Sequence, residues 1–109
     1  MLVGAEVNAL ELNGVCIGNK SVASVPTPTY KVEYASSTDK YRFHDGKVFH
    51  EFEGRKEYYY NKIRVSPFNP NHFISGHMKF VFDKKGPAYV VVATKLFWKV
   101  IYLDCTISW

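Results

Sequence analysis

Long apolar runs and abundant helix-forming residues are both missing from this sequence. No apolar run approaches the roughly 20 residues that a helix needs to cross a bilayer, and the longest ones, AYVVVA and VIYL, have the length of strands. Alanine, leucine and glutamate, which favour helices, are not abundant. No amphipathic helical pattern persists for three turns. The sequence therefore predicts neither a membrane-bound protein nor a helical fold.

Cysteine is scarce, since Cys16 and Cys105 near opposite ends are the two in the chain. Two cysteines are too few to imply a disulfide framework. The first residues, MLVGAEVNALEL, lack a basic leader and carry Glu6 early, which is not typical of a signal peptide. We therefore expect reduced, buried thiols and a cytoplasmic location. A bridge between the two cysteines in an oxidising compartment is the alternative.

Catalytic and cofactor motifs are also missing. The sequence has no G-x-x-x-x-G-K phosphate loop and no G-x-G-x-x-G fingerprint. His72 and His77 follow an H-x-x-x-x-H spacing that matches no metal motif. We therefore expect a non-enzymatic protein without a metal or cofactor.

What the sequence does contain is typical of one small β domain. The 109 residues, 47% hydrophobic and 22% charged, suit a single folded domain over residues 1–109. The aromatic fraction is 17%, with eight Tyr and eight Phe, which favours strands. The net charge of +4 and the pI of about 9.1 permit an anionic partner without requiring one.

Short apolar segments separated by turn residues predict an all-β fold with little or no helix. We expect an antiparallel sandwich or a small, partly open barrel of roughly seven to nine short strands. The predicted strands are residues 3–12, 15–18, 30–35, 40–44, 47–53, 56–65, 79–82, 88–94 and 96–107. Residues 66–78 are predicted to be an irregular loop with room for one short helical turn.

Glycine-containing dipeptides predict where the strands reverse. Asn13-Gly14 and Asp45-Gly46 favour type I′ turns, and Gly54-Arg55 suits a type II′ turn. A four-residue loop over 36–39 would join two further strands. Because turn length fixes register, the cross-strand pairs follow by counting. The expected pairs are Lys31–His44, Glu33–Arg42, His44–Lys47, Arg42–Phe49, Lys47–Lys62, Phe49–Tyr60, Glu51–Tyr58 and Glu53–Lys56.

This register separates two faces of the sheet. The face expected to cover the core carries Val32, Tyr34, Tyr41, Phe43, Val48, His50, Tyr59 and Asn61. The opposite, charged face carries a basic row beside aromatic rings, a combination that holds single-stranded nucleic acid. The candidate binding residues are Lys31, Arg42, His44, Lys47, Phe49, Tyr58, Tyr60, Lys62 and Arg64.

Two other classes of function compete with nucleic-acid binding. Tyrosine and arginine are also residues of protein-interface hot spots, so the same face, or the 66–78 loop, could bind a protein partner or a second copy of the chain. The third class is a small hydrolase or nuclease. It would use His44 with Glu33 or Glu51, beside Lys31 and Lys47.

The Asp45-Gly46 turn places His44 and His50 on opposite faces, which argues against a joint zinc site. His50, among tyrosines, is expected to be a core histidine whose hydrogen bonds are satisfied.

Overall fold

The computed structural model describes residues 12–25, 31–53, 55–82, 88–93 and 97–108, and these form strands without a helix. The predicted all-β, partly open barrel is confirmed. The ten antiparallel strands are β1 (Asn13–Val25), β2 (Lys31–Ser36), β3 (Lys40–His44), β4 (Lys47–Glu51), β5 (Tyr58–Lys62), β6 (Arg64–Val65), β7 (His72–Ser75), β8 (Met78–Val81), β9 (Ala88–Ala93) and β10 (Trp98–Ser108). The described residues include no helix that is long and apolar enough to cross a membrane.

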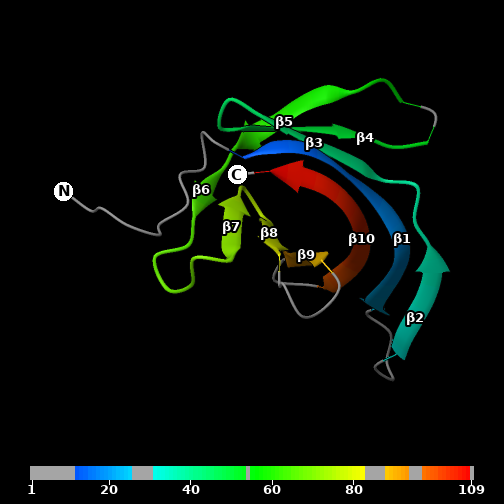
Figure 1. Cartoon of the computed structure of the whole chain (residues 1–109). Coiled ribbons are helices and arrows are strands. Elements are labelled where there is room, and N and C mark those ends of the chain that lie inside the picture. Colours follow the sequence, from blue (N-terminus) through cyan, green and yellow to red (C-terminus); the bar gives the residue numbers. More distant parts are fainter. Residues whose placement is uncertain (1–11, 26–30, 54, 83–87, 94–96, 109) are drawn as a thin grey trace.

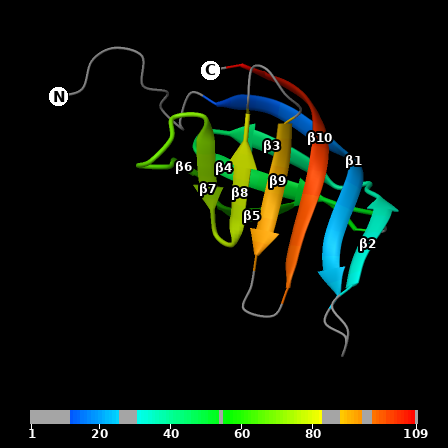
Figure 2. The same ribbon diagram turned by 90° about the horizontal axis from the view of Figure 1, so that it is seen from below.

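The sheet has the order β5-β4-β3-β1-β10-β9-β8-β7-β6, and β2 pairs with β1 beside this path. Figure 1 shows β1 and β10 as long, curved strands that run together from one layer of the fold into the other. In Figure 2, β7, β8, β9 and β10 lie side by side as the second layer. Strands that pass between crossed layers form the corners of such folds.

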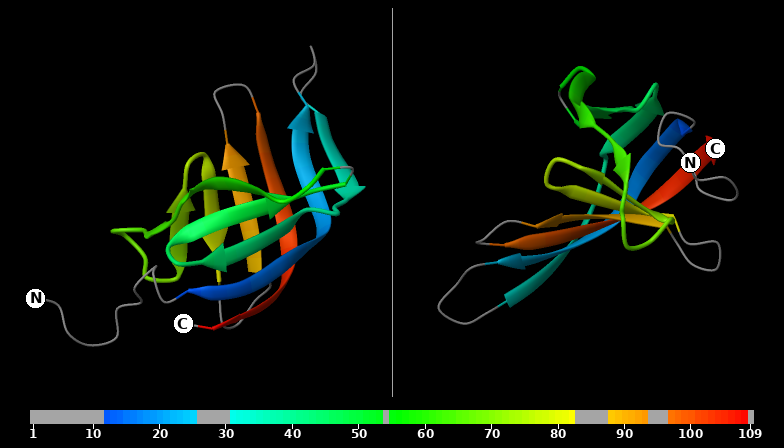
Figure 3. Two further views of the ribbon diagram at one scale, coloured as in Figure 1. Left: turned by 90° about the horizontal axis from the view of Figure 1, so that it is seen from above. Right: turned by 90° about the vertical axis from the view of Figure 1, so that its left-hand side faces the viewer.

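The bend in β1 coincides with an irregularity in its pairing. The register between β1 and β10 shifts between Gly18 and Ser21, which inserts one extra residue into β1. Such a bulge bends a strand and increases its twist. As a result, residues 14–17 of β1 pair with β3, whereas residues 20–25 pair with β2. β1, β2, β9 and β10 extend away from β3, β4 and β5 in the right-hand view of Figure 3.

The two strands at the ends of the sheet are consecutive in the chain. Only Ile63 separates β5 from β6, and its backbone N–H donates to Gly46 O at 2.9 Å. The side chain of Ile63 is buried. The curled sheet therefore brings β5 and β6 together along a line that we call the seam.

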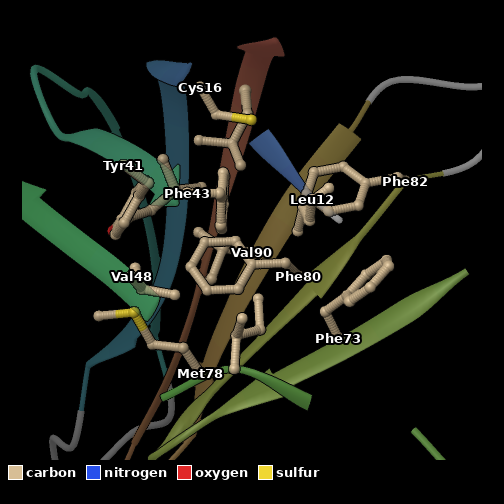
Figure 4. Packing of buried hydrophobic residues seen from close by; sticks show 13 residues of the cluster. Leu12, Cys16, Tyr41, Phe43, Val48, Phe73, Met78, Phe80, Phe82 and Val90 are labelled. Carbon is tan, nitrogen blue, oxygen red and sulfur yellow. The ribbon is translucent and has the colours of Figure 1, made fainter. Parts of the chain in front are cut away.

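Aromatic rings fill the space between the layers. Phe80 lies at the centre, with the rings of Tyr41 and Phe43 edge-on to it at 5.2 and 5.0 Å (Figure 4). Phe82 lies 5.8 Å from Phe43, and Val48 packs in the same cluster. Buried side chains alternate with less buried ones along β3, because Tyr41 and Phe43 face this core.

A disulfide joins Cys16 and Cys105, so the prediction of reduced, free thiols is wrong. The two residues are direct partners in the β1–β10 pair, with an S–S distance of 2.03 Å. The expected burial is confirmed for Cys16, which is fully enclosed. The sequence could not reveal the bond, because 89 positions separate the two cysteines and only the sheet order brings them together.

The predicted hairpin between β2 and β3 is wrong. β2 pairs with β1, and the connecting residues cross the bulge in β1, where Gly18 N–H donates to Asp39 O at 2.6 Å and Ser37 N–H donates to Asn19 O at 3.0 Å. A side chain at position 18 would collide with Ser37. The glycine therefore permits this close crossing.

Three further predictions need correction or lie outside the described residues. Asn13-Gly14 lies within β1 and is not a turn. The 66–78 segment is not irregular throughout, because it contains β7, paired with β8 through a turn at Gly76-His77. Val32 and Tyr34, expected to cover the core, are 39% and 79% exposed. The predicted 3–12 strand, apart from Leu12, and the Gly54 turn position lie outside the described residues.

We expect the disulfide to contribute strongly to stability. A cross-link over a span of this length restricts the unfolded chain by roughly 4–5 kcal/mol in the chain-entropy view. Replacing both Cys16 and Cys105 by alanine should lower the free energy of unfolding, measured by urea titration, by about 2–5 kcal/mol. Adding a reductant should lower the urea midpoint of the wild-type protein and leave the urea midpoint of the double variant unchanged. Equal responses of the two proteins would contradict the bond.

Candidate functional site

The β3–β4 hairpin forms as its sequence predicts. Asp45 and Gly46 have φ of 53° and 70°, the positive values that a type I′ turn requires. His44 pairs with Lys47, and Arg42 pairs with Phe49, which confirms both predicted pairs. Arg42, His44, Lys47 and Phe49 therefore share the outer face of this hairpin.

The β4–β5 pairing departs from the prediction by one residue. Lys47 pairs with Lys62 as expected, but the register shifts between Val48 and Phe49. Beyond the shift, Phe49 pairs with Tyr59, and His50 pairs with Tyr58. The predicted Phe49–Tyr60 and Glu51–Tyr58 pairs are therefore wrong. The physical reason is a β-bulge that adds one residue to β5, which reverses the facing of every side chain beyond it.

The bulge turns Tyr60 toward the core. Its ring packs against the buried cluster, and its hydroxyl oxygen accepts a hydrogen bond from His77 N–H at 3.1 Å. Gly76, with φ of +56°, makes room for it, because a Cβ there would lie 2.7 Å from the Tyr60 hydroxyl. Tyr59, predicted to face the core, takes the outer position. It is 48% exposed, with its ring 5.9 Å from that of Phe49.

Arg42 lies on the outer face but is already paired. Its Nη2 and Nε bind the Glu57 carboxylate at 2.8 and 3.1 Å, and its guanidinium lies 4.3 Å from the centre of the Phe49 ring. This hydrogen-bonded pairing raises the pKa of Arg42 and lowers the pKa of Glu57. Arg42 thus holds Phe49 in place, and the Glu57 carboxylate offsets the positive charge of Arg42. The sequence predictions gave Glu57 no role and placed it within a strand over residues 56–65, whereas in the structure it precedes β5.

The residues proposed for acid–base chemistry do not all come together, although His44 pairs with Lys47. Lys31 and Glu33 lie on β2, opposite Val25 and Ala23 of β1. His44 belongs to the strand that pairs with the other half of β1, and its Nδ1 lies 3.1 Å from Asn13 Oδ1. No cluster of three metal-ligating side chains occurs within the described part of the chain.

A row of cations crosses the seam on the outside of the barrel. Lys62 and Arg64 are exposed on either side of the buried Ile63. On the β5 side, Lys62 pairs with Lys47 of β4, which in turn pairs with His44 of β3. On the β6 side, Arg64 pairs with Ile74, which pairs with the exposed Lys79. We call His44, Lys47, Lys62, Arg64 and Lys79 the cationic belt.

An open groove of about 380 Å³ lies at the centre of the belt. Its lining combines charged, amide and apolar groups. The lining residues are Asn61, Lys62, Ile63, Arg64, Ile74 and Gly76. The groove therefore offers two cations beside apolar surface, which suits a ligand that carries negative charge on an organic frame.

Acidic side chains are absent from the wall of the barrel that β5, β6, β7 and β8 form. Residues 58–82, which form β5, β6, β7 and β8, contain neither aspartate nor glutamate. The carboxylate of Asp45 lies against the belt, 3.3 Å from Lys47 Nζ. Burial and then the charge of Lys79 lower the pKa of His72. Lys62, Arg64 and Lys79 have no acidic residue on their own strands, which favours a positive potential on this wall.

His50 has the role predicted for a core histidine. It is 7% exposed, stacks on Tyr41 at 4.6 Å, and hydrogen-bonds through both ring nitrogens. Nε2 lies 2.8 Å from Asp39 Oδ1, and Nδ1 lies 2.8 Å from the Tyr58 hydroxyl. A carboxylate only accepts hydrogen bonds, so Nε2–H donates to Asp39 and, in the neutral ring, the Tyr58 hydroxyl donates to Nδ1. Tyr58 therefore supports the core side of the sheet and not the outer face.

These features define a small, nearly closed all-β barrel with a cationic belt across its seam. No family model matches the chain, and no curated protein or solved structure is significantly similar to it.

The Asp39–His50 contact predicts a pH dependence of stability. The hydrogen bond from His50 holds the pKa of Asp39 below its ordinary value, so the ionised carboxylate stabilises the fold. That contribution is complete above the unfolded-state pKa of about 4 and is lost as the pH falls through the lower folded-state pKa. Asp39→Asn should lower the free energy of unfolding by about 1–3 kcal/mol near neutral pH. The difference from wild type, measured by urea unfolding, should shrink in acid. A difference that stays constant from neutral pH into strong acid would contradict this role.

Proposed function

We propose that the protein binds single-stranded nucleic acid along the cationic belt. The observation that carries this proposal is the acid-free wall of residues 58–82, which presents Lys62, Arg64 and Lys79 beside Lys47 of the neighbouring hairpin. Adjacent strands lie about 5 Å apart, so the cations form an extended row and not one compact pocket. An extended row suits a polymer with one negative charge at each repeat.

The row next to the belt supplies an aromatic surface. Tyr59 is half exposed, and Phe49, itself covered by Arg42, supports its ring. Stacking of a base on an exposed ring contributes about 1–3 kcal/mol and tolerates any base. A basic row with an adjacent exposed ring is the combination that single-strand binders use.

The roles of the candidate residues change accordingly. His44, Lys47, Lys62 and Arg64 keep the role of phosphate contacts, and Lys79 joins them. Tyr59 takes the place of Tyr60 as the ring beside the belt, whereas Phe49 and Arg42 hold Tyr59 in place. Tyr58 and Tyr60 belong to the core side, and Lys31 lies on a distant strand.

Binding of a protein partner, or of a second copy of the chain, is the second candidate function. The observation that favours it is β2, which pairs with β1 alone among the described strands and exposes Val32 and Tyr34. An extended segment that adds to such an edge gains main-chain hydrogen bonds. This surface lies on the part of the sheet that extends away from β3, β4 and β5 (Figure 3), so the two functions do not compete for space.

The disulfide bears on where the protein works. Disulfides persist mainly in oxidising compartments. The cytoplasmic location expected from the N-terminal residues stays an untested prediction, and the Cys16–Cys105 bond argues against it.

The proposal predicts a steep salt dependence of oligonucleotide binding. Each cation–phosphate contact adds about 0.7 to the slope of log affinity against log salt for a single strand. The double variant Lys62→Ala/Arg64→Ala should therefore lower the slope by about 1.4 and weaken binding roughly 25-fold near 0.1 M salt. Fluorescence anisotropy of a labelled oligonucleotide at several salt concentrations measures both quantities.

A charge-matched control separates the belt from net charge. Lys20 and Lys56 are exposed and lie outside the belt, so Lys20→Ala/Lys56→Ala removes the same charge without touching it. This control should retain most of the wild-type affinity. The absence of wild-type binding at about 50 mM salt, or equal losses in the two double variants, would overturn the proposal.

A further inference from the structure

The loop between β6 and β7 exposes a phenylalanine that the fold does not use. Phe68 is 95% exposed, more than any other large apolar side chain of the described residues. Burying a phenylalanine typically contributes about 1.5–3 kcal/mol, and Phe68 forgoes this contribution. The ring is therefore free to contact a partner from outside the chain.

The loop that carries Phe68 is held in place by hydrogen bonds. Ser66 N–H donates to His72 O at 2.8 Å, and His72 N–H donates to Asn69 O at 3.1 Å. Phe68 N–H donates to Ser66 Oγ at 3.2 Å, and Asn71 N–H donates to Asn69 Oδ1 at 2.9 Å. The ring is therefore presented on an ordered backbone, which lowers the entropy lost when a ligand binds.

The loop continues directly from the belt. Phe68 follows Arg64 by four residues, so their Cα atoms lie at most about 14 Å apart. Both belong to the acid-free stretch of residues 58–82. Figures 1 and 3 show the connection from β6 to β7 projecting from the end of the sheet.

We propose that Phe68 stacks on an unpaired base of the nucleic acid whose phosphates follow Arg64 and Lys62. This inference rests on the proposed function and specifies the ligand further. The ring of Tyr59 is partly covered by Phe49, whereas the exposure of Phe68 leaves its ring accessible. Bases inside a duplex already stack on their neighbours and must be unstacked before they can stack on protein. Phe68 therefore makes the site selective for single strands.

A comparison of two polyanions separates base stacking from charge. The probes are a labelled oligothymidylate of about 12 nucleotides and an abasic oligomer with the same number of phosphates. Wild type should bind the base-bearing probe roughly 5- to 150-fold more tightly. Phe68→Ala should lower this preference to the share that Tyr59 contributes and leave the affinity for the abasic probe unchanged, whereas Phe68→Trp should retain the full preference.

Two controls make the result decisive. Tyr34→Ala removes an exposed ring from the distant β2 and should leave both affinities unchanged. The urea midpoint of Phe68→Ala should equal that of wild type, because the lost ring makes no buried contact.

Each outcome decides between the two proposals. If Phe68→Ala keeps the wild-type preference for bases, the role of Phe68 is overturned and the proposed function stands. If wild type binds both probes equally, the role of Phe68 is likewise overturned and the belt binds polyanions by charge alone. If wild type binds neither probe, both proposals are overturned.

Discussion

The antiparallel pairing of β1 with β10 is the constraint on which the rest of the structure depends. Each strand belongs to both layers, and the register shift between Gly18 and Ser21 lets the pair bend from one layer into the other. The Cys16–Cys105 bond fixes this pairing covalently. Because the pair bends, the two arms of the sheet fold over one aromatic core. Their outermost strands, β5 and β6, then meet at the seam, and the seam creates the cationic belt.

A second irregularity, the bulge at Tyr60, decides which rings face the solvent. Without the extra residue, Tyr60 would stand beside Phe49 on the outer face, and Tyr59 would face the core. With it, Tyr60 reaches across the seam to the turn at Gly76, and Tyr59 lies beside the belt. The bulge in β5 therefore has two effects. It lets Tyr60 join the two sides of the barrel, and it leaves the ring of Tyr59 next to the cations.

The features that could be predicted from the sequence are those set by neighbouring residues. Asp45-Gly46 determines the first hairpin, which places Arg42, Lys47 and Phe49 correctly, and the tyrosines around His50 anticipate its buried, hydrogen-bonded role. The features that could not be predicted depend on distant segments. The pairing of β2 with β1 follows from the bend in β1, and the partner of Cys16 follows from the order of the sheet. The bulge in β5 depends on the contact between Tyr60 and the turn at Gly76, and no local turn pattern reveals that contact.

The contact between Tyr60 and the Gly76-His77 turn tests the central claim most directly, since it exists only if the sheet curls closed and β5 carries its bulge. Nuclear Overhauser effects between the Tyr60 ring and the Gly76 α-protons, together with the exchange rate of the His77 amide, measure it. The account predicts strong cross-peaks from the Tyr60 ring to Gly76, a protected His77 amide, and ring-to-ring cross-peaks between Phe49 and Tyr59. Cross-peaks joining Phe49 to Tyr60, with rapid exchange at His77, would contradict the account.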